Sequence, residues 1–72
     1  MYNTVLDGGE RAADDVFKAI AGRDPNPGGI DINVRSTPNG DIITIIRNST
    51  GDRTVEIQNF VTREIDKIRF RP

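Results

Sequence analysis

The chain has 72 residues, 10 basic and 11 acidic side chains, a net charge of −1, and neither cysteine nor histidine. This length allows one domain with one core. Without cysteine, a disulfide framework, a thiolate zinc site and a cysteine nucleophile are excluded, and without histidine the commonest general acid or base is missing. Any catalysis must therefore use Lys, Arg, Asp, Glu, Ser or Thr, and we expect no metal ion and no other cofactor.

The apolar segments and the first residues indicate whether the chain crosses a membrane or carries a secretion signal. The apolar run at 42–46 is far too short to span a bilayer, and residues 1–4 lack the basic and apolar regions of a signal peptide. We therefore expect a soluble chain without a membrane segment, which is cytoplasmic if it is free-standing. If it is exported, another part of a larger protein carries the signal.

A helix is predicted over about 8–22. Asp7 followed by Glu10 fits an N-cap with a capping-box acid three residues later. Gly22 is a suitable C-terminal cap, and the Pro- and Gly-rich segment 24–29 prevents continuation. The apolar residues at helical spacing are Ala13, Val16, Phe17, Ile20 and Ala21.

After this segment the apolar period changes from 3.6 to 2, which predicts strands at about 30–36, 41–48, 53–60 and 66–71. Asn39-Gly40 is typical of a tight hairpin. The predicted fold class is α+β, a single domain over 1–72 in which one N-terminal helix packs on a roughly four-stranded antiparallel meander. The predicted core residues are Val16, Phe17, Ile20, Ile30, Ile32, Val34, Ile43, Ile45, Val55, Ile57, Phe60, Ile68 and Phe70.

A single helix covers one face of such a sheet and leaves the other face partly open. The last ten residues carry four bases and two acids. This bias is typical of ordinary surface charge, and it also fits a basic sheet face that meets an anion.

Arginines and hydroxyls gather near the second hairpin. The candidate catalytic residues are Arg47, Thr54 and Lys67, and the candidate substrate-binding residues are Ser49, Thr50, Arg53 and Arg69. Such groups on an open sheet suit a phosphodiester, whose charge rises in the transition state. In RNA the 2′-hydroxyl is itself a nucleophile, so proton transfer falls either to Lys67 or to a carboxylate such as Glu56. The alternative is the ordinary composition of turns and exposed strands.

The segments 38–57 and 65–70 resemble the end of bacterial polymorphic-toxin ribonuclease domains of the barnase–EndoU–colicin–RelE type. In these domains a Gly turn, an apolar strand ending in Arg, a Ser/Thr-Gly turn and a final Lys-Ile-x-Phe-like strand follow one another. This chain has Glu56 where Asp is usual and lacks the histidine that many relatives use. The matching residues are Gly40, Arg47, Ser49, Gly51, Thr54, Val55, Ile57, Lys67, Ile68 and Phe70.

The resemblance implies a ribonuclease toxin domain at the C-terminal end of a larger secreted protein. Its substrate would be RNA, with tRNA among the candidates, in the cytoplasm of a target bacterium, and its partner a cognate immunity protein. Two alternatives are a small non-enzymatic protein-interaction module, as in phage or accessory proteins, and a nucleic-acid binder without catalysis. With only four aromatic residues, a base-stacking platform is not expected.

Overall fold

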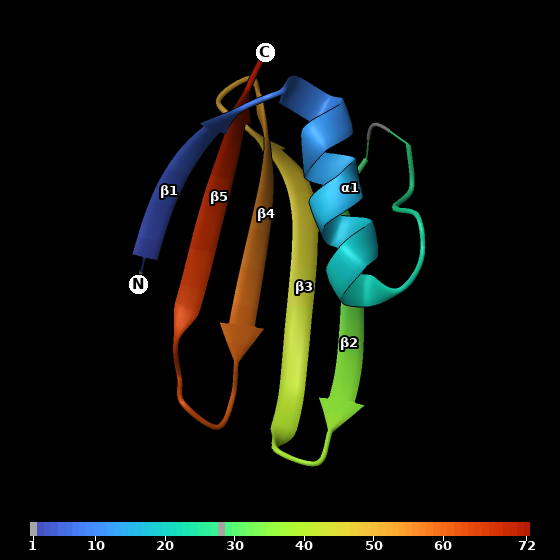
Figure 1. Cartoon of the computed structure of the whole chain (residues 1–72), viewed down its shortest axis with the longest axis vertical. Helices are drawn as coiled ribbons and strands as arrows, with labels where there is room; N and C mark the ends of the chain where they lie inside the picture. Colours follow the sequence, from blue (N-terminus) through green and yellow to red (C-terminus); the bar gives the residue numbers. More distant parts are fainter. Residues whose placement is uncertain (1, 28) are drawn as a thin grey trace.

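The computed structural model describes residues 2–27 and 29–72, which form one helix on one face of a five-stranded sheet (Figure 1). The α+β class predicted from the sequence is confirmed. The elements in chain order are β1 (Tyr2–Asp7), α1 (Gly9–Ala21), β2 (Asp31–Thr37), β3 (Gly40–Ser49), β4 (Asp52–Asn59) and β5 (Ile65–Arg71).

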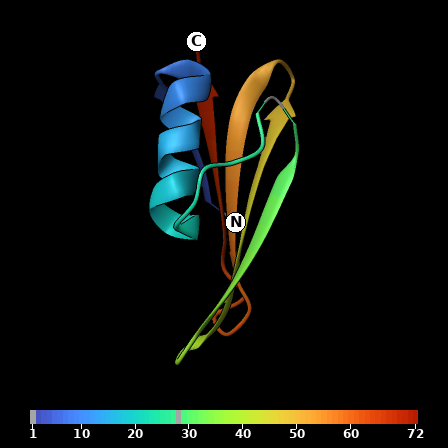
Figure 2. The same cartoon turned by 90° about the vertical axis from the view of Figure 1, so that its right-hand side faces the viewer.

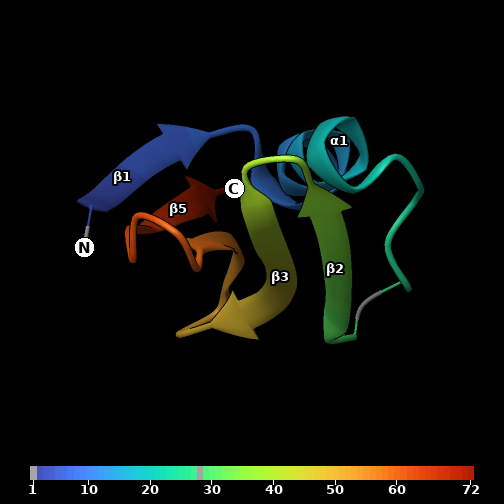
Figure 3. The same cartoon turned by 90° about the horizontal axis from the view of Figure 1, so that it is seen from below.

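The sheet has the strand order β1-β5-β4-β3-β2. β2 to β5 form the predicted antiparallel meander, with two-residue connections between β2 and β3 and between β3 and β4. The prediction of four antiparallel strands is wrong in one respect, because β1 adds a fifth strand that pairs in parallel with β5. β1 and β2 are thus the two edges of the sheet, as Figure 3 shows from below.

Asp7 was predicted as the N-cap of the helix, but the residues before the helix form strand β1. Asp7 is the last residue of β1, and its carboxylate lies 3.1 Å from the guanidinium of Arg71. The N-cap is Gly8, whose φ of 111° favours glycine and which makes no side-chain capping bond. The other end agrees with the sequence, because Gly22 has φ 80° and its N–H donates to the Lys18 carbonyl at 2.8 Å.

The core lies between α1 and the middle strands. Viewed from the β2 edge in Figure 2, α1 lies on one side of the sheet, and no other helix or strand of the described residues lies on the opposite side. We call these sides the helix face and the open face. The buried apolar residues are Ala13, Phe17, Ile46, Val55 and Phe70, and Ala12, Val16, Ala21, Ile57 and Ile68 pack against them.

The alternating side chains of β2 point to the opposite faces from those predicted. Ile32 and Val34 are 56% and 59% exposed on the open face, and Ile30, before the strand, is exposed as well. Asp31 faces the helix instead, where it accepts two hydrogen bonds from Arg23, at 2.7 and 2.8 Å, and one from the Asn26 N–H at 2.9 Å. These charge-assisted bonds fix the strand against the end of α1, so the apolar alternation points outward.

Other predicted core residues also lie outside the core. Ile43 and Ile45 are register partners of Val34 and Ile32, so they share the open face and are only partly buried. Phe60 follows β4 in a turn and is 57% exposed. The core is therefore smaller than the number of apolar residues suggests, and several aliphatic side chains remain on the open face.

Candidate functional site

Strand register brings four of the predicted site residues onto the open face. Arg47 on β3 is the partner of Thr54 on β4, which is the partner of Arg69 on β5. In the next row Glu56 on β4 is the partner of Lys67 on β5. Cross-strand partners share a face with side chains about 5 Å apart at Cβ, so the three cations surround Glu56 and Thr54.

Two ion pairs order this cluster. One Arg47 Nη atom lies 3.5 Å from a Glu56 carboxylate oxygen, and Asp52 accepts hydrogen bonds from Nε and Nη2 of Arg69 at 3.2 and 2.8 Å. The side chain of Glu56 is only 14% exposed. Among the described residues, Lys67 makes no ion pair, so its ammonium is available to a ligand.

Thr54 lies in the predicted row but does not reach the surface. It is fully buried, and its hydroxyl donates to the Asp52 carbonyl at 3.4 Å. Its position between Arg47 and Arg69 allows it to support both side chains. Ser49 ends β3 opposite Asp52, and Thr50 follows in the turn with φ 51°, so both lie at the rim of the cluster.

Arg53, predicted as a substrate-binding residue, does not lie on the open face with the other candidate residues. Adjacent residues of a strand point to opposite faces, so Arg53 and Thr54 cannot share one. Arg53 is 4% exposed beneath the helix, where its guanidinium donates to the carbonyls of Gly29, at 2.6 Å, and Asn26, at 3.4 Å. Its Nε lies 3.7 Å from Asp14. It holds the segment between α1 and β2.

Carboxylates on the helix face have shifted pKa values. Burial raises the pKa of Asp14 above its ordinary value, and the charge of Arg53 opposes this only partly. The hydrogen bonds from Arg23, followed by the bond from the Asn26 N–H, hold the pKa of Asp31 well below its ordinary value. The lowered pKa of Asp31 shows that its charged form stabilises the fold, and both groups lie away from the open-face cluster.

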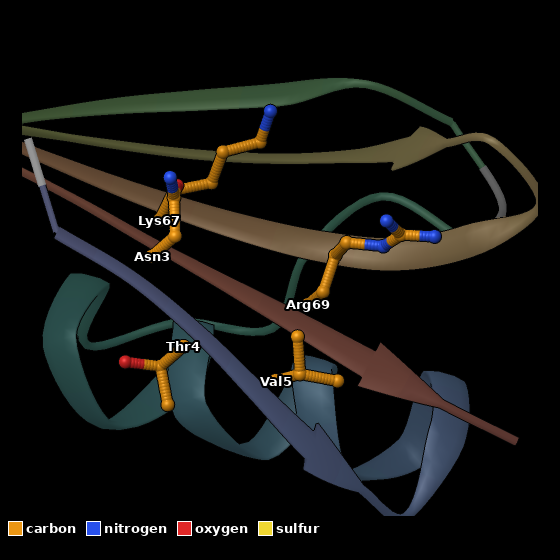
Figure 4. Close-up of a pocket in the computed structure, with 5 residues that line it drawn as sticks. All are labelled: Asn3, Thr4, Val5, Lys67 and Arg69. Atoms are coloured by element: carbon orange, nitrogen blue, oxygen red, sulfur yellow. The ribbon is translucent and has the colours of Figure 1, made fainter.

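A groove runs beside the cluster between β1 and β5. It has a volume of about 300 Å³ and is lined by Asn3, Thr4, Val5, Lys67 and Arg69. In Figure 4 the side chains of Asn3, Lys67 and Arg69 point to the same side, whereas Thr4 points to the other. Asn3 is the register partner of Lys67. Sequence reasoning missed Asn3 because it missed β1, whose only signal is the short β-favouring run Thr4-Val5-Leu6.

Charged and aliphatic side chains occupy different parts of the open face. The charged cluster occupies one end of β3, β4 and β5, and aliphatic side chains occupy β2 and the adjoining part of β3. The aliphatic group consists of Ile32, Val34, Ile43 and Ile45. The face therefore has a charged end, with three cations, and an apolar end on one surface.

Comparison with protein-family models, with curated proteins and with solved structures gave no match. Within residues 2–27 and 29–72, no helix is both long and apolar enough to cross a membrane. In the same part of the chain, no three or more acidic side chains are grouped so as to hold a metal ion.

Proposed function

We propose that this chain is an endoribonuclease domain that cleaves RNA on its open face without a metal ion. The observation that carries the proposal is the position of Glu56, a carboxylate set between Arg47 at 3.5 Å and its cross-strand partner Lys67. A carboxylate beside two cations supplies a base and charge stabilisers, the groups that 2′-hydroxyl attack needs in a chain without histidine.

In the proposed reaction Glu56 accepts the proton of the ribose 2′-hydroxyl as the 2′-oxygen forms a bond to phosphorus. The bond between phosphorus and the 5′-oxygen breaks, and the ammonium of Lys67 donates a proton to the departing oxygen. The products are a 2′,3′-cyclic phosphate and a 5′-hydroxyl. Solvent then takes the proton from Glu56 and returns one to Lys67, so the protein is unchanged.

Arg47, which pairs with Glu56, stabilises the charge that develops on the phosphoryl oxygens, and Arg69 lies one row further along β5, where it contacts the RNA backbone beside the reacting group. Each guanidinium has five N–H donors, and the ion pairs with Glu56 and Asp52 use only some of them. Asn3 lies beyond Lys67 in the same row and contributes an amide to the groove. Thr54 supports the two arginines from below, and Arg53 has no part in the chemistry.

The resemblance to polymorphic-toxin ribonucleases supports the biological setting. We propose that the domain is the C-terminal part of a larger secreted toxin, acts in the cytoplasm of a target bacterium and is neutralised by a cognate immunity protein. An inhibitor that covers the open face would need acidic groups opposite Lys67 and Arg69 and apolar groups opposite Ile32 and Val34.

The test is cleavage of total RNA by the purified chain in the presence of a chelator. We expect fragments with 2′,3′-cyclic or 3′-phosphate ends, and a fall in rate of about 10²- to 10⁴-fold for Glu56→Gln, which removes the base and keeps the shape. Arg11→Gln, on the exposed side of α1, is the matched control and should cleave like the parent chain. Absence of cleavage by the parent chain, or equal cleavage by Glu56→Gln, would refute the proposal.

A second candidate function is a non-enzymatic protein-interaction module. The exposure of Ile32 and Val34, beside Ile43 and Ile45, favours it, because exposed aliphatic clusters are typical of protein contact surfaces. Replacing Ile32 and Val34 by serine separates the two functions. If the chain is a non-enzymatic module, the parent chain should not cleave RNA and the double serine variant should lose partner binding; if the chain is a ribonuclease, the variant should still cleave RNA.

A further inference from the structure

β5 carries a ladder of cations along a single face. Lys67, Arg69 and Arg71 alternate with Ile68 and Phe70, so the strand is basic toward the open face and apolar toward the core. Successive cations are two residues apart, which is about 6.7 Å in an extended strand. This distance is comparable to one nucleotide of a stretched sugar–phosphate backbone.

We propose that the substrate is an extended single strand of RNA that lies along β5, with one phosphate on each of the three cations. This inference rests on the proposed function and specifies the form of its substrate. The groove between β1 and β5 begins the path, because Lys67 and Arg69 form one of its walls and Asn3 and Val5 lie opposite them. Arg71 extends the path to the end of the strand.

The geometry favours a single strand over a duplex. The cations form one line along a strand, and the groove of about 300 Å³ lies beside the first two of them, Lys67 and Arg69. In a duplex each strand winds away from such a line after a few phosphates, and the cations of β5 would lose their partners. Grooves that follow one backbone with a row of cations are typical of single-strand binding.

The ladder is available to a ligand even though two of its members have carboxylate partners. The side chain of Arg71 is 60% exposed, and its partner Asp7 is more exposed still. Surface ion pairs of this kind contribute little, so a phosphate competes with them easily. Arg69 keeps N–H donors that Asp52 does not use, and no carboxylate of the described residues pairs with Lys67.

The protein side of this path has few groups that read bases. Of the aromatic side chains that the structure describes, Phe17 and Phe70 are buried in the core, and Phe60 lies in the turn after β4 and does not line the groove. Binding should therefore depend on phosphate number and salt more than on sequence. For single strands the logarithm of affinity falls with the logarithm of salt concentration by about 0.7 per phosphate contact, which gives a slope of about −2 for three contacts.

The experiment measures binding of a 2′-O-methyl RNA oligomer by fluorescence anisotropy over a range of salt concentrations. The methyl group blocks the nucleophile, so binding is observed without cleavage. We expect a slope of about −2 for the parent chain, and a slope shallower by about 0.7 for Arg71→Gln. Arg71→Glu should weaken binding further, and Arg11→Gln should bind like the parent chain. The duplex of the same sequence should bind more weakly than the single strand.

Thermal unfolding of each variant shows whether it is folded, and Lys67→Gln provides a second position on the ladder if Arg71 variants are unstable. Equal binding of duplex and single strand, or an unchanged slope in both Arg71→Gln and Lys67→Gln, would overturn the inference even if RNA is cleaved. Conversely, the expected slopes without any RNA cleavage would support the single-strand path and refute the ribonuclease function.

Discussion

Replacing Arg53 with methionine removes a buried guanidinium and leaves an apolar chain of similar length. Three contacts are lost, to the carbonyls of Gly29 and Asn26 and to the carboxylate of Asp14. A hydrogen bond to a charged group contributes about 1.5–3 kcal/mol, and breaking a buried ion pair costs about 3–5 kcal/mol. These contributions overlap, and Asp14 is one-third exposed and is rehydrated, so we expect a loss of about 3 kcal/mol.

This loss is large for a chain of 72 residues, whose free energy of unfolding is about 4–11 kcal/mol at about 0.05–0.15 kcal/mol per residue. The assay is urea unfolding followed by circular dichroism. With a slope of about 1 kcal/mol per molar urea, the midpoint should fall by about 3 M. Arg11→Met, on the exposed side of α1, should shift it by less than about 0.5 M.

The same variant distinguishes the two interpretations of Arg53. Because Arg53 lies on the helix face, RNA cleavage per folded molecule should be unchanged in Arg53→Met. If the urea midpoint is unchanged and cleavage is lost, then Arg53 contacts the substrate as the sequence pattern suggested. The assignment of Arg53 to the fold would then be refuted.

Two further predictions concern stability. Because the folded-state pKa of Asp31 is depressed, its contribution is present above the ordinary Asp pKa and is lost as pH falls below about 4. Asp31→Asn should therefore lower the melting temperature at pH 7 and flatten its decline below pH 4, and an equal decline in both proteins would contradict this. Ile32→Ser should change the free energy of unfolding by less than about 0.5 kcal/mol because Ile32 is exposed. Ile46→Ala in the core should cost about 2–5 kcal/mol, and similar urea midpoints for the two would contradict the phase of β2 and β3.

The sequence predicted the elements whose signals are local. α1 has a continuous apolar stripe and a glycine at its end, and β3 and β4 are joined at a turn-forming sequence, so their bounds differ from the prediction by only one residue. β1 was missed because its pairing with β5 joins opposite ends of the chain, which no local pattern reveals. β2 was predicted, but not which of its side chains face the helix. That choice depends on the bonds between Arg23 and Asp31, which form only because of where the helix ends.

The open-face cluster was predicted in part for a related reason. Arg47 and Thr54 are register partners across a two-residue turn, and Lys67 and Arg69 follow one another at a spacing of two, so their shared face follows from alternation. Ser49 and Thr50 follow from the turn itself. Arg53 was grouped with these residues because it is close to them in sequence, but the alternation along β4 places it on the helix face.

The alternation along β4 separates two classes of charge that composition alone cannot distinguish. Arg53 lies on the helix face, where it holds the segment before β2, is shielded from solvent and pairs with the partly exposed Asp14 of α1. Glu56 is three positions after Arg53 on the same strand, so its side chain points to the opposite face, where it lies with Arg47 and Lys67. Removal of a helix-face charge should therefore act on stability, and removal of an open-face charge should act on RNA. Because one strand supplies both, Arg53→Met and Glu56→Gln form an internal pair of variants, and similar effects of the two on unfolding and on cleavage would contradict the separation of the two faces.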